Sequence, residues 1–163
     1  MKQYFTAGDL LPGAAVTRYF PLSGEIASAT ETAKGSLISL NGYLRNFRVK
    51  LPFSPGSGIT RTFTVYQNGS STPMTVSITH PNTTAFNNGM DLAVSSFDRI
   101  TIESTVSGGT PAAINATTCM EYEPTTANRF ITACGSQSTL NTGGVRDYCP
   151  IGASGGTIAF STT

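Results

Sequence analysis

Residues 43–51 read YLRNFRVKL, and the apolar residues at the end of this stretch alternate with polar ones. Phe47, Val49 and Leu51 occupy every second position, and a polar side chain separates each from the next. Successive side chains of a β-strand point to opposite faces, so a period of two is typical of a strand with one face in a core. The stretch therefore predicts a half-buried strand.

The same alternation continues along the chain. The runs 61–67 and 74–79 both alternate, and the Asn-Gly pair at 68–69 between them favours a tight hairpin turn. Two more runs, 90–94 and 100–102, follow with the same period. Together with the first stretch, these runs predict five strands in close succession.

Weaker strand signals lie outside this block, at residues 16–22, 36–40 and 114–122. The total is about eight short strands, separated by breaks rich in Gly, Pro, Asn and Ser, and no apolar run shows a sustained helical period. This pattern predicts an all-β chain that folds as a single jelly-roll-like antiparallel β-sandwich. A barrel is the structural alternative, because alternation does not reveal how a sheet closes.

The domain organisation follows from length and composition. A chain of 163 residues is expected to form one domain. We expect the sandwich core at 14–123, an N-terminal arm at 1–13 and a C-terminal extension rich in Gly, Ser and Thr at 124–163. Arms of this composition bury too little apolar surface to offset their ordering entropy alone, but they could be ordered by docking on neighbouring subunits.

The charge balance limits the classes of partner. Charged residues make up 12% of the chain and the net charge is +1, so few charges would be desolvated in close packing against other proteins. The best basic cluster, Arg45, Arg48 and Lys50, is interpreted as a solvated strand face that discourages edge pairing. We expect no nucleic-acid partner. No stretch has the length of a membrane span, and the N-terminus lacks the apolar core of a signal peptide, so synthesis in the cytoplasm is expected.

The three cysteines, Cys119, Cys134 and Cys149, lie in the last third of the chain. An odd count without a signal peptide favours reduced thiols, and the spacing contains no C-x-x-C pair for zinc. A disulfide between Cys134 and Cys149, closing a loop near the C-terminus, is the alternative. No metal site is expected.

Catalysis is not expected either. The single histidine, His80, precedes a proline at the end of a strand, where it more readily caps or meets solvent than acts as a base. Glu121 and Glu123 share one strand face, which could serve glycoside hydrolysis or calcium binding, but a solvated strand end is the simpler interpretation. The chain is therefore interpreted as a non-enzyme without a cofactor.

A family resemblance rests on several of these segments. The strand at 42–51, the Pro-Gly loop at 54–58, the hairpin at 62–78 and the run FDRITI at 97–102 resemble a β-sandwich module of virion proteins in large DNA viruses and phages. The resemblance covers about sixty residues. It departs at Phe97, because the family pattern often has a small residue directly before the Asp.

The resemblance implies a jelly-roll component of the virion, most simply a minor capsid or cement protein. Its partners would be the major capsid protein and other minor capsid proteins, in a homo- or hetero-oligomer. The alternative is a receptor- or glycan-binding head of a viral fibre or tail, expected to be trimeric. Interface hot spots are commonly aromatic, and the candidates, each of which could equally be core, are Tyr4, Phe5, Tyr19, Phe20, Phe130, Tyr148 and Phe160.

Overall fold

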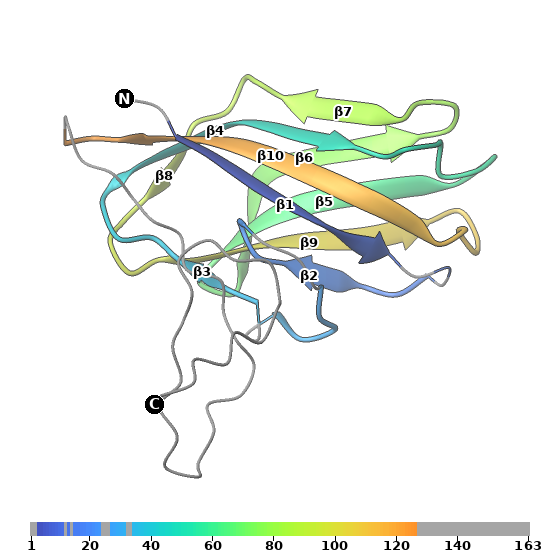
Figure 1. The fold of residues 1–163 in the computed structure, drawn as a ribbon, viewed down its shortest axis with the longest axis horizontal. Coiled ribbons are helices and arrows are strands. Elements are labelled where there is room, and N and C mark those ends of the chain that lie inside the picture. The colour runs from blue at the N-terminus through green and yellow to red at the C-terminus, as the bar shows by residue number, and fades with distance from the viewer. Residues whose placement is uncertain (1–2, 12, 14, 24–26, 32–33, 127–163) are drawn as a thin grey trace, which may run out of the picture.

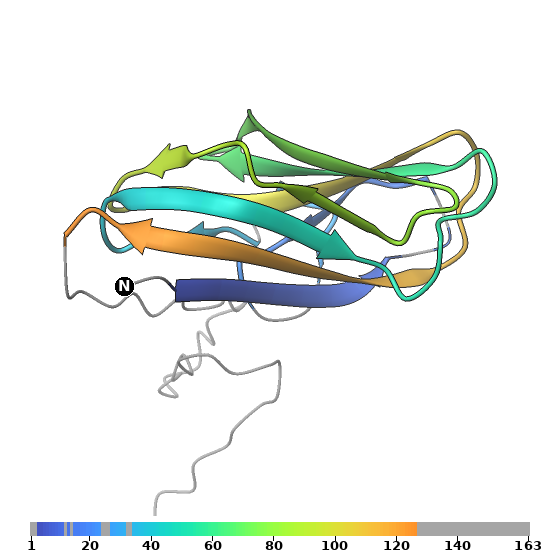
Figure 2. The same cartoon turned by 90° about the horizontal axis from the view of Figure 1, so that it is seen from above.

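The protein is a sandwich of two five-stranded antiparallel sheets packed face to face, as Figures 1 and 2 show from two directions. The computed structural model describes residues 3–126, except 12, 14, 24–26 and 32–33. No α-helix occurs among these residues. The predicted all-β sandwich is confirmed, and its two separate sheets rule out the barrel alternative.

The first sheet contains the strand predicted from residues 43–51 at its centre. Its members, in spatial order, are β1 (Gln3–Leu11), β10 (Ile114–Pro124), β4 (Gly42–Lys50) and then β7 (Thr84–Asn87) and β8 (Leu92–Val94). Both β7 and β8 pair with β4, one after the other along its length. They therefore form one interrupted edge of this sheet.

The second sheet has the same design. Its members, in spatial order, are β2 (Arg18–Phe20) and β3 (Ser36–Leu37), then β9 (Arg99–Ser107), β5 (Thr60–Gln67) and β6 (Ser70–Thr79). Both β2 and β3 pair with β9, again in succession along one edge. The hairpin predicted around the Asn-Gly pair is confirmed as β5 and β6.

The strand order is that of a jelly roll. With each interrupted edge counted as one strand, a four-stranded sheet β1–β10–β4–β7/β8 faces a four-stranded sheet β2/β3–β9–β5–β6. The chain crosses from one sheet to the other between successive strands, except at the β5–β6 hairpin. Two sheets interleaved in this way define the jelly-roll architecture. The total equals the predicted eight, but the members differ, since the runs at 16–22 and 36–40, predicted as two strands, form the single edge β2/β3, and β1 was not predicted as a strand.

The core lies between the sheets and uses the residues that alternate in sequence. Phe47, Val49 and Leu51 are buried, as predicted, and so are Phe63 and Val65 of β5. The inward face of β10 carries the predicted row of side chains, which are Ile114, Ala116, Thr118, Met120 and Tyr122. Burial of apolar area on both inner faces is the main stabilising contribution to such a fold.

Residues 3–11 differ from the expected N-terminal arm. They form β1, an edge strand that pairs with β10 through an unbroken antiparallel register. Phe5, Ala7 and Leu11 are buried against the other sheet, which explains why this segment is ordered within its own subunit. At the other end, β10 reaches Pro124, and the rest of the predicted C-terminal extension lies almost wholly outside the described residues.

Candidate interaction surface

A groove of about 520 Å³ crosses the outer face of the first sheet, where β10, β4 and β7 lie side by side. Strands β4 and β7 contribute most of its lining, and β10 contributes one wall. The lining residues are Arg48, Val49, Lys50, Thr84, Ala85, Phe86, Asn88, Thr117 and Cys119. The volume lies within the range of sites that hold small ligands or short peptide segments.

Strand register explains why these side chains meet. Residues directly opposite one another in antiparallel strands point to the same face of the sheet. Two rows of three outward positions result, the first being Cys119, Arg48 and Phe86, and the second Thr117, Lys50 and Thr84. On the β10 side the second row ends at Gly8 of β1, which adds no side chain. The groove therefore has two cations along its centre, an aromatic wall and a hydroxyl-bearing floor.

The two central cations are available for a ligand. Arg48 and Lys50 are exposed, and neither forms an ion pair with a carboxylate whose side chain the structure describes. Cys119, a free thiol within this part of the chain, is partly exposed beside them. The groove thus carries net positive charge next to apolar surface.

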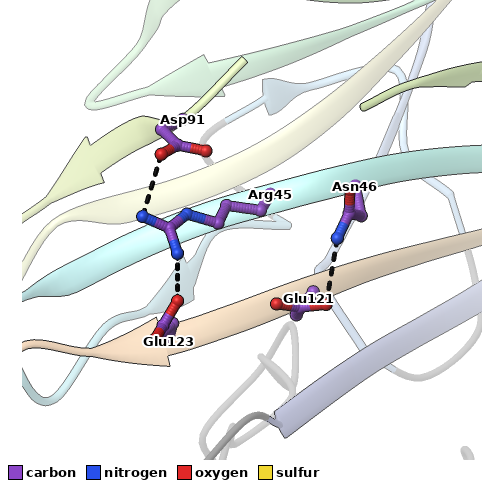
Figure 3. A network of polar contacts seen from close by, with 5 residues as sticks. All are labelled: Arg45, Asn46, Asp91, Glu121 and Glu123. Atoms are coloured by element: carbon purple, nitrogen blue, oxygen red, sulfur yellow. Dashed lines mark hydrogen bonds and ion pairs between the residues drawn. The ribbon is translucent and has the colours of Figure 1, made fainter. Parts of the chain in front are cut away.

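A polar network beside the groove uses the remaining outward charges of this face (Figure 3). Arg45 forms an ion pair with Asp91 at 2.8 Å between Nη2 and Oδ2, and a second, short contact with Glu123. Its guanidinium also lies 5.1 Å from the ring centroid of Tyr43. Arg45 is therefore neutralised within the subunit, unlike Arg48.

The network is built around a bulge. Asn46 has a φ of 51°, and the register between β4 and β10 shifts between Cys119 and Glu121. Asn46 donates from Nδ2 to Oε2 of Glu121 at 3.0 Å, and Glu121 is only 4% exposed. A bulge re-aims side chains and raises the local twist. Here it turns the Asn46 amide towards the buried carboxylate.

These contacts correct two sequence interpretations. The basic cluster of β4 does not guard an edge, since β4 is flanked by β10 on one side and by β7 and β8 on the other. Glu121 is not at a solvated strand end, because it is buried beside Asn46, and Glu123 is engaged by Arg45. Neither fact could be predicted from the sequence, because the bulge at Asn46 interrupts the apolar alternation of β4 and because β7 shows no such alternation.

The aromatic interface candidates other than Tyr19 fall into three groups. Tyr4 is 66% exposed on the edge strand β1. Phe5 and Phe20 are 5% and 1% exposed, so the interface prediction is wrong for both, because their positions in β1 and β2 point inward. Phe130, Tyr148 and Phe160 lie outside the described residues, as do Cys134 and Cys149.

Tyr19 is partly buried on the outer face of the second sheet. Its hydroxyl donates to Oε1 of Glu103 at 3.1 Å, and its ring meets the edge of Tyr66 at a centroid distance of 5.9 Å. Burial, followed by the hydrogen bond to Glu103, raises the pKa of Tyr19 to about 12. Tyr19 thus makes its main polar contact within its own subunit.

Two exposed apolar side chains were not expected as contact residues. Phe97, in the turn between β8 and β9, is 82% exposed, and Leu37 of β3 is 58% exposed. Backbone hydrogen bonds between Ile38 and the Phe97–Asp98 turn hold the two segments together. The signal in the sequence was the departure from the pattern that the chain resembles, which often has a small residue at the position of Phe97.

A scan against protein-family models found no match to this chain, and a search of curated proteins also found none.

Within the described part of the chain, no group of three or more His, Cys, Asp or Glu residues could hold a metal ion. Nor does this part contain a helix long and apolar enough to cross a membrane. His80 is exposed and lies 2.9 Å from the hydroxyl of Ser54, measured from Nδ1.

Proposed function

We propose that this protein is a structural component of a virus particle, a minor capsid or cement subunit that binds neighbouring capsid proteins. The observation that carries the proposal is the jelly-roll strand order, which agrees with the segments that resemble virion β-sandwich modules. A fold by itself does not define a function. The proposal therefore also rests on surface features suited to contact with other proteins.

Exposed aromatic residues are the first such feature. Tyr4, Phe86 and Phe97 are each at least 66% exposed, and they lie on three different elements. Aromatic side chains dominate the hot spots of protein interfaces, since they bury a large area at low entropic cost. A rigid sandwich that presents several of them can bind more than one neighbour, as a cement subunit must.

The low density of charge is the second feature. Only 12% of the chain is charged, and Arg45, Arg99 and Glu31 are among the charged residues already paired within the subunit. A surface of hydroxyl and amide groups can be buried against another protein at a lower desolvation cost than a charged one. This favours packing in an assembly.

A receptor- or glycan-binding head is the second candidate. It is favoured by one observation, the groove on the outer face of the first sheet, in which an exposed Phe86 stands beside Thr84 and Asn88. An aromatic face with hydroxyl and amide groups around it also suits a sugar ring. The two candidates predict different locations for the protein in a particle.

Quantitative mass spectrometry of purified particles, before and after mild removal of their outer layer, tests the proposal. Many copies that persist until the shell breaks are expected of a cement subunit. A few copies, lost with the outer layer, would instead indicate a fibre or receptor-binding head. Absence of the protein from particles at both stages would overturn both viral candidates.

A further inference from the structure

We propose that the groove between β10, β4 and β7 binds an extended acidic segment of a partner protein. The segment would carry carboxylates at two alternate positions and an apolar or aromatic side chain two positions further along, so that all three side chains point to the same face. This inference rests on the proposed function and deepens it, since it specifies the chemistry of one neighbouring subunit. It follows from the spacing, the charge and the aromatic wall of the groove.

The spacing of the cations matches an extended chain. Arg48 and Lys50 are two residues apart on β4 and point to the same outer face, so their Cα atoms lie about 7 Å apart. The side chains of a partner segment in extended conformation repeat with the same two-residue distance. Two carboxylates at alternate positions can therefore meet both cations at once.

Charge complementarity selects an anion. Arg45, on the same strand, is neutralised by Asp91 and Glu123, whereas Arg48 and Lys50 have no carboxylate partner among the described residues. The sheet keeps two like charges close together, and an acidic ligand would remove their mutual repulsion. Arg48 can also grip a carboxylate through two parallel N–H donors.

The wall of the groove adds an apolar requirement. Phe86 is 68% exposed and stands directly opposite Arg48 across the β4–β7 pair. An apolar or aromatic side chain of the ligand can pack on this ring and on the aliphatic stem of Arg48. A ligand with charge alone would leave that surface in water. An extended peptide can supply both the alternate carboxylates and the apolar side chain.

The first test uses two synthetic peptides and the full chain. Isothermal titration calorimetry compares acetyl-ETETF-amide with acetyl-QTQTF-amide, which has the same length and apolar residue but no charge. We expect the acidic peptide to bind at least tenfold more tightly, and its affinity to fall between 50 and 300 mM salt, as screening predicts. Equal binding of the two peptides, or of neither, would overturn the proposal.

Charge-reversal variants then locate the site. Arg48→Glu and Lys50→Glu should each weaken the acidic peptide about tenfold or more. Arg18→Glu, on β2 in the other sheet, changes the net charge by the same amount and should leave the affinity within about twofold. Equal losses in all three variants would mean that only net charge matters, contrary to a built groove. Thermal unfolding of each variant confirms that it is folded.

A second pair of variants tests the aromatic wall. Phe86→Ala should weaken the acidic peptide about five- to tenfold, whereas Phe53→Ala, at another exposed phenylalanine, should not change its affinity. Identical behaviour of the two variants would contradict a role for Phe86.

An acidic glycan is the competing ligand. A hyaluronan octasaccharide that binds more tightly than the acidic peptide, and loses affinity in Arg48→Glu, would overturn the protein-partner assignment. These measurements use isolated protein, so their failure leaves the particle location undecided. The particle mass spectrometry can fail independently, and the two proposals are therefore separable.

Discussion

The backbone N–H of Phe97 donates to the carbonyl oxygen of Ile38 at 2.7 Å, although Phe97 has a φ of 72°. The N–H of Ile38 in turn donates to the carbonyl of Asp98 at 2.8 Å, so the residue directly after β3 holds this turn in place. A bulky L-residue in the left-handed region is strained by about 1–2 kcal/mol. The ring is 82% exposed, so burial within the subunit does not offset that strain. Strain of this kind persists only where the surrounding structure holds the residue in place, and it clusters at functional sites.

Replacement of Phe97 by glycine should therefore stabilise the isolated protein. Relief of the strained backbone outweighs the greater entropy of a glycine in the unfolded chain, and the free energy of unfolding should rise by about 1 kcal/mol. Urea unfolding measures the change. Phe53→Gly is the matched control, because Phe53 is exposed but does not have a positive φ. A Phe97→Gly protein less stable than the wild type would contradict this account.

The edge strand β1 should contribute strongly to stability. Phe5 is 5% exposed within the core, whereas its neighbour Tyr4 is 66% exposed. Phe5→Ala should lower the free energy of unfolding by about 3–5 kcal/mol, and Tyr4→Ala by less than about 1 kcal/mol. Denaturant unfolding of the two variants checks the contrast. Equal, small losses would mean that residues 3–11 behave as the detached arm that the sequence suggested.

The fold could be predicted where alternation is uninterrupted. Hydrophobic periodicity at 47–51 and 63–65 identified the inward positions because both segments belong to central strands, half in the core and half outside. The Asn-Gly pair at 68–69 identified the hairpin for an equally local reason, since type I′ turns need a positive φ at both central residues, which Asn and Gly adopt readily. Long-range pairing was not needed for either inference.

The candidate site could not be predicted because it depends on pairing between distant segments. Strand β7 has no apolar alternation, and only its pairing with β4 brings Phe86 beside Arg48. The bulge at Asn46 leaves Leu44 and Phe47 both inward although they are three residues apart, which breaks the period of two. The apolar alternation in residues 3–11 was hidden because Asp9 interrupts the row formed by Phe5, Ala7 and Leu11 in the sequence. Tertiary contacts decide all three cases.

The bulge itself offers a test through Asn46. Asn46→Ala removes the hydrogen bond to buried Glu121 and also places alanine, which tolerates a positive φ poorly, in the left-handed region. Asn46→Gly removes only the hydrogen bond, because glycine adopts a positive φ without strain. Both should destabilise the protein, and the alanine variant should be worse by about 1 kcal/mol. Chemical denaturation of the pair measures the difference. Equal stabilities would show that the bulge relaxes when its amide is lost.

The last prediction concerns acid stability and the carboxylate of Asp98. Desolvation raises the pKa of Asp98, but hydrogen bonds from the Ser95 N–H, Asn68 and Gln67 outweigh it, so the pKa lies below the usual value of 3.8. A depressed pKa in the folded state contributes stability above the pKa of the unfolded chain, and this contribution is lost as the pH falls through the folded pKa. The loss should therefore occur below about pH 4.

Two measurements test whether the pKa of Asp98 is lowered in the folded state. The stability difference between the wild type and Asp98→Asn should be largest near pH 7 and should narrow below about pH 4. NMR titration of the Asp98 carboxyl carbon measures its pKa directly. Asn68→Gly keeps the left-handed backbone of Asn68, which has a φ of 55°, but removes its amide donor, so this variant should raise the pKa of Asp98. A pKa for Asp98 at or above 3.8 in the wild type would contradict the hydrogen-bonding argument.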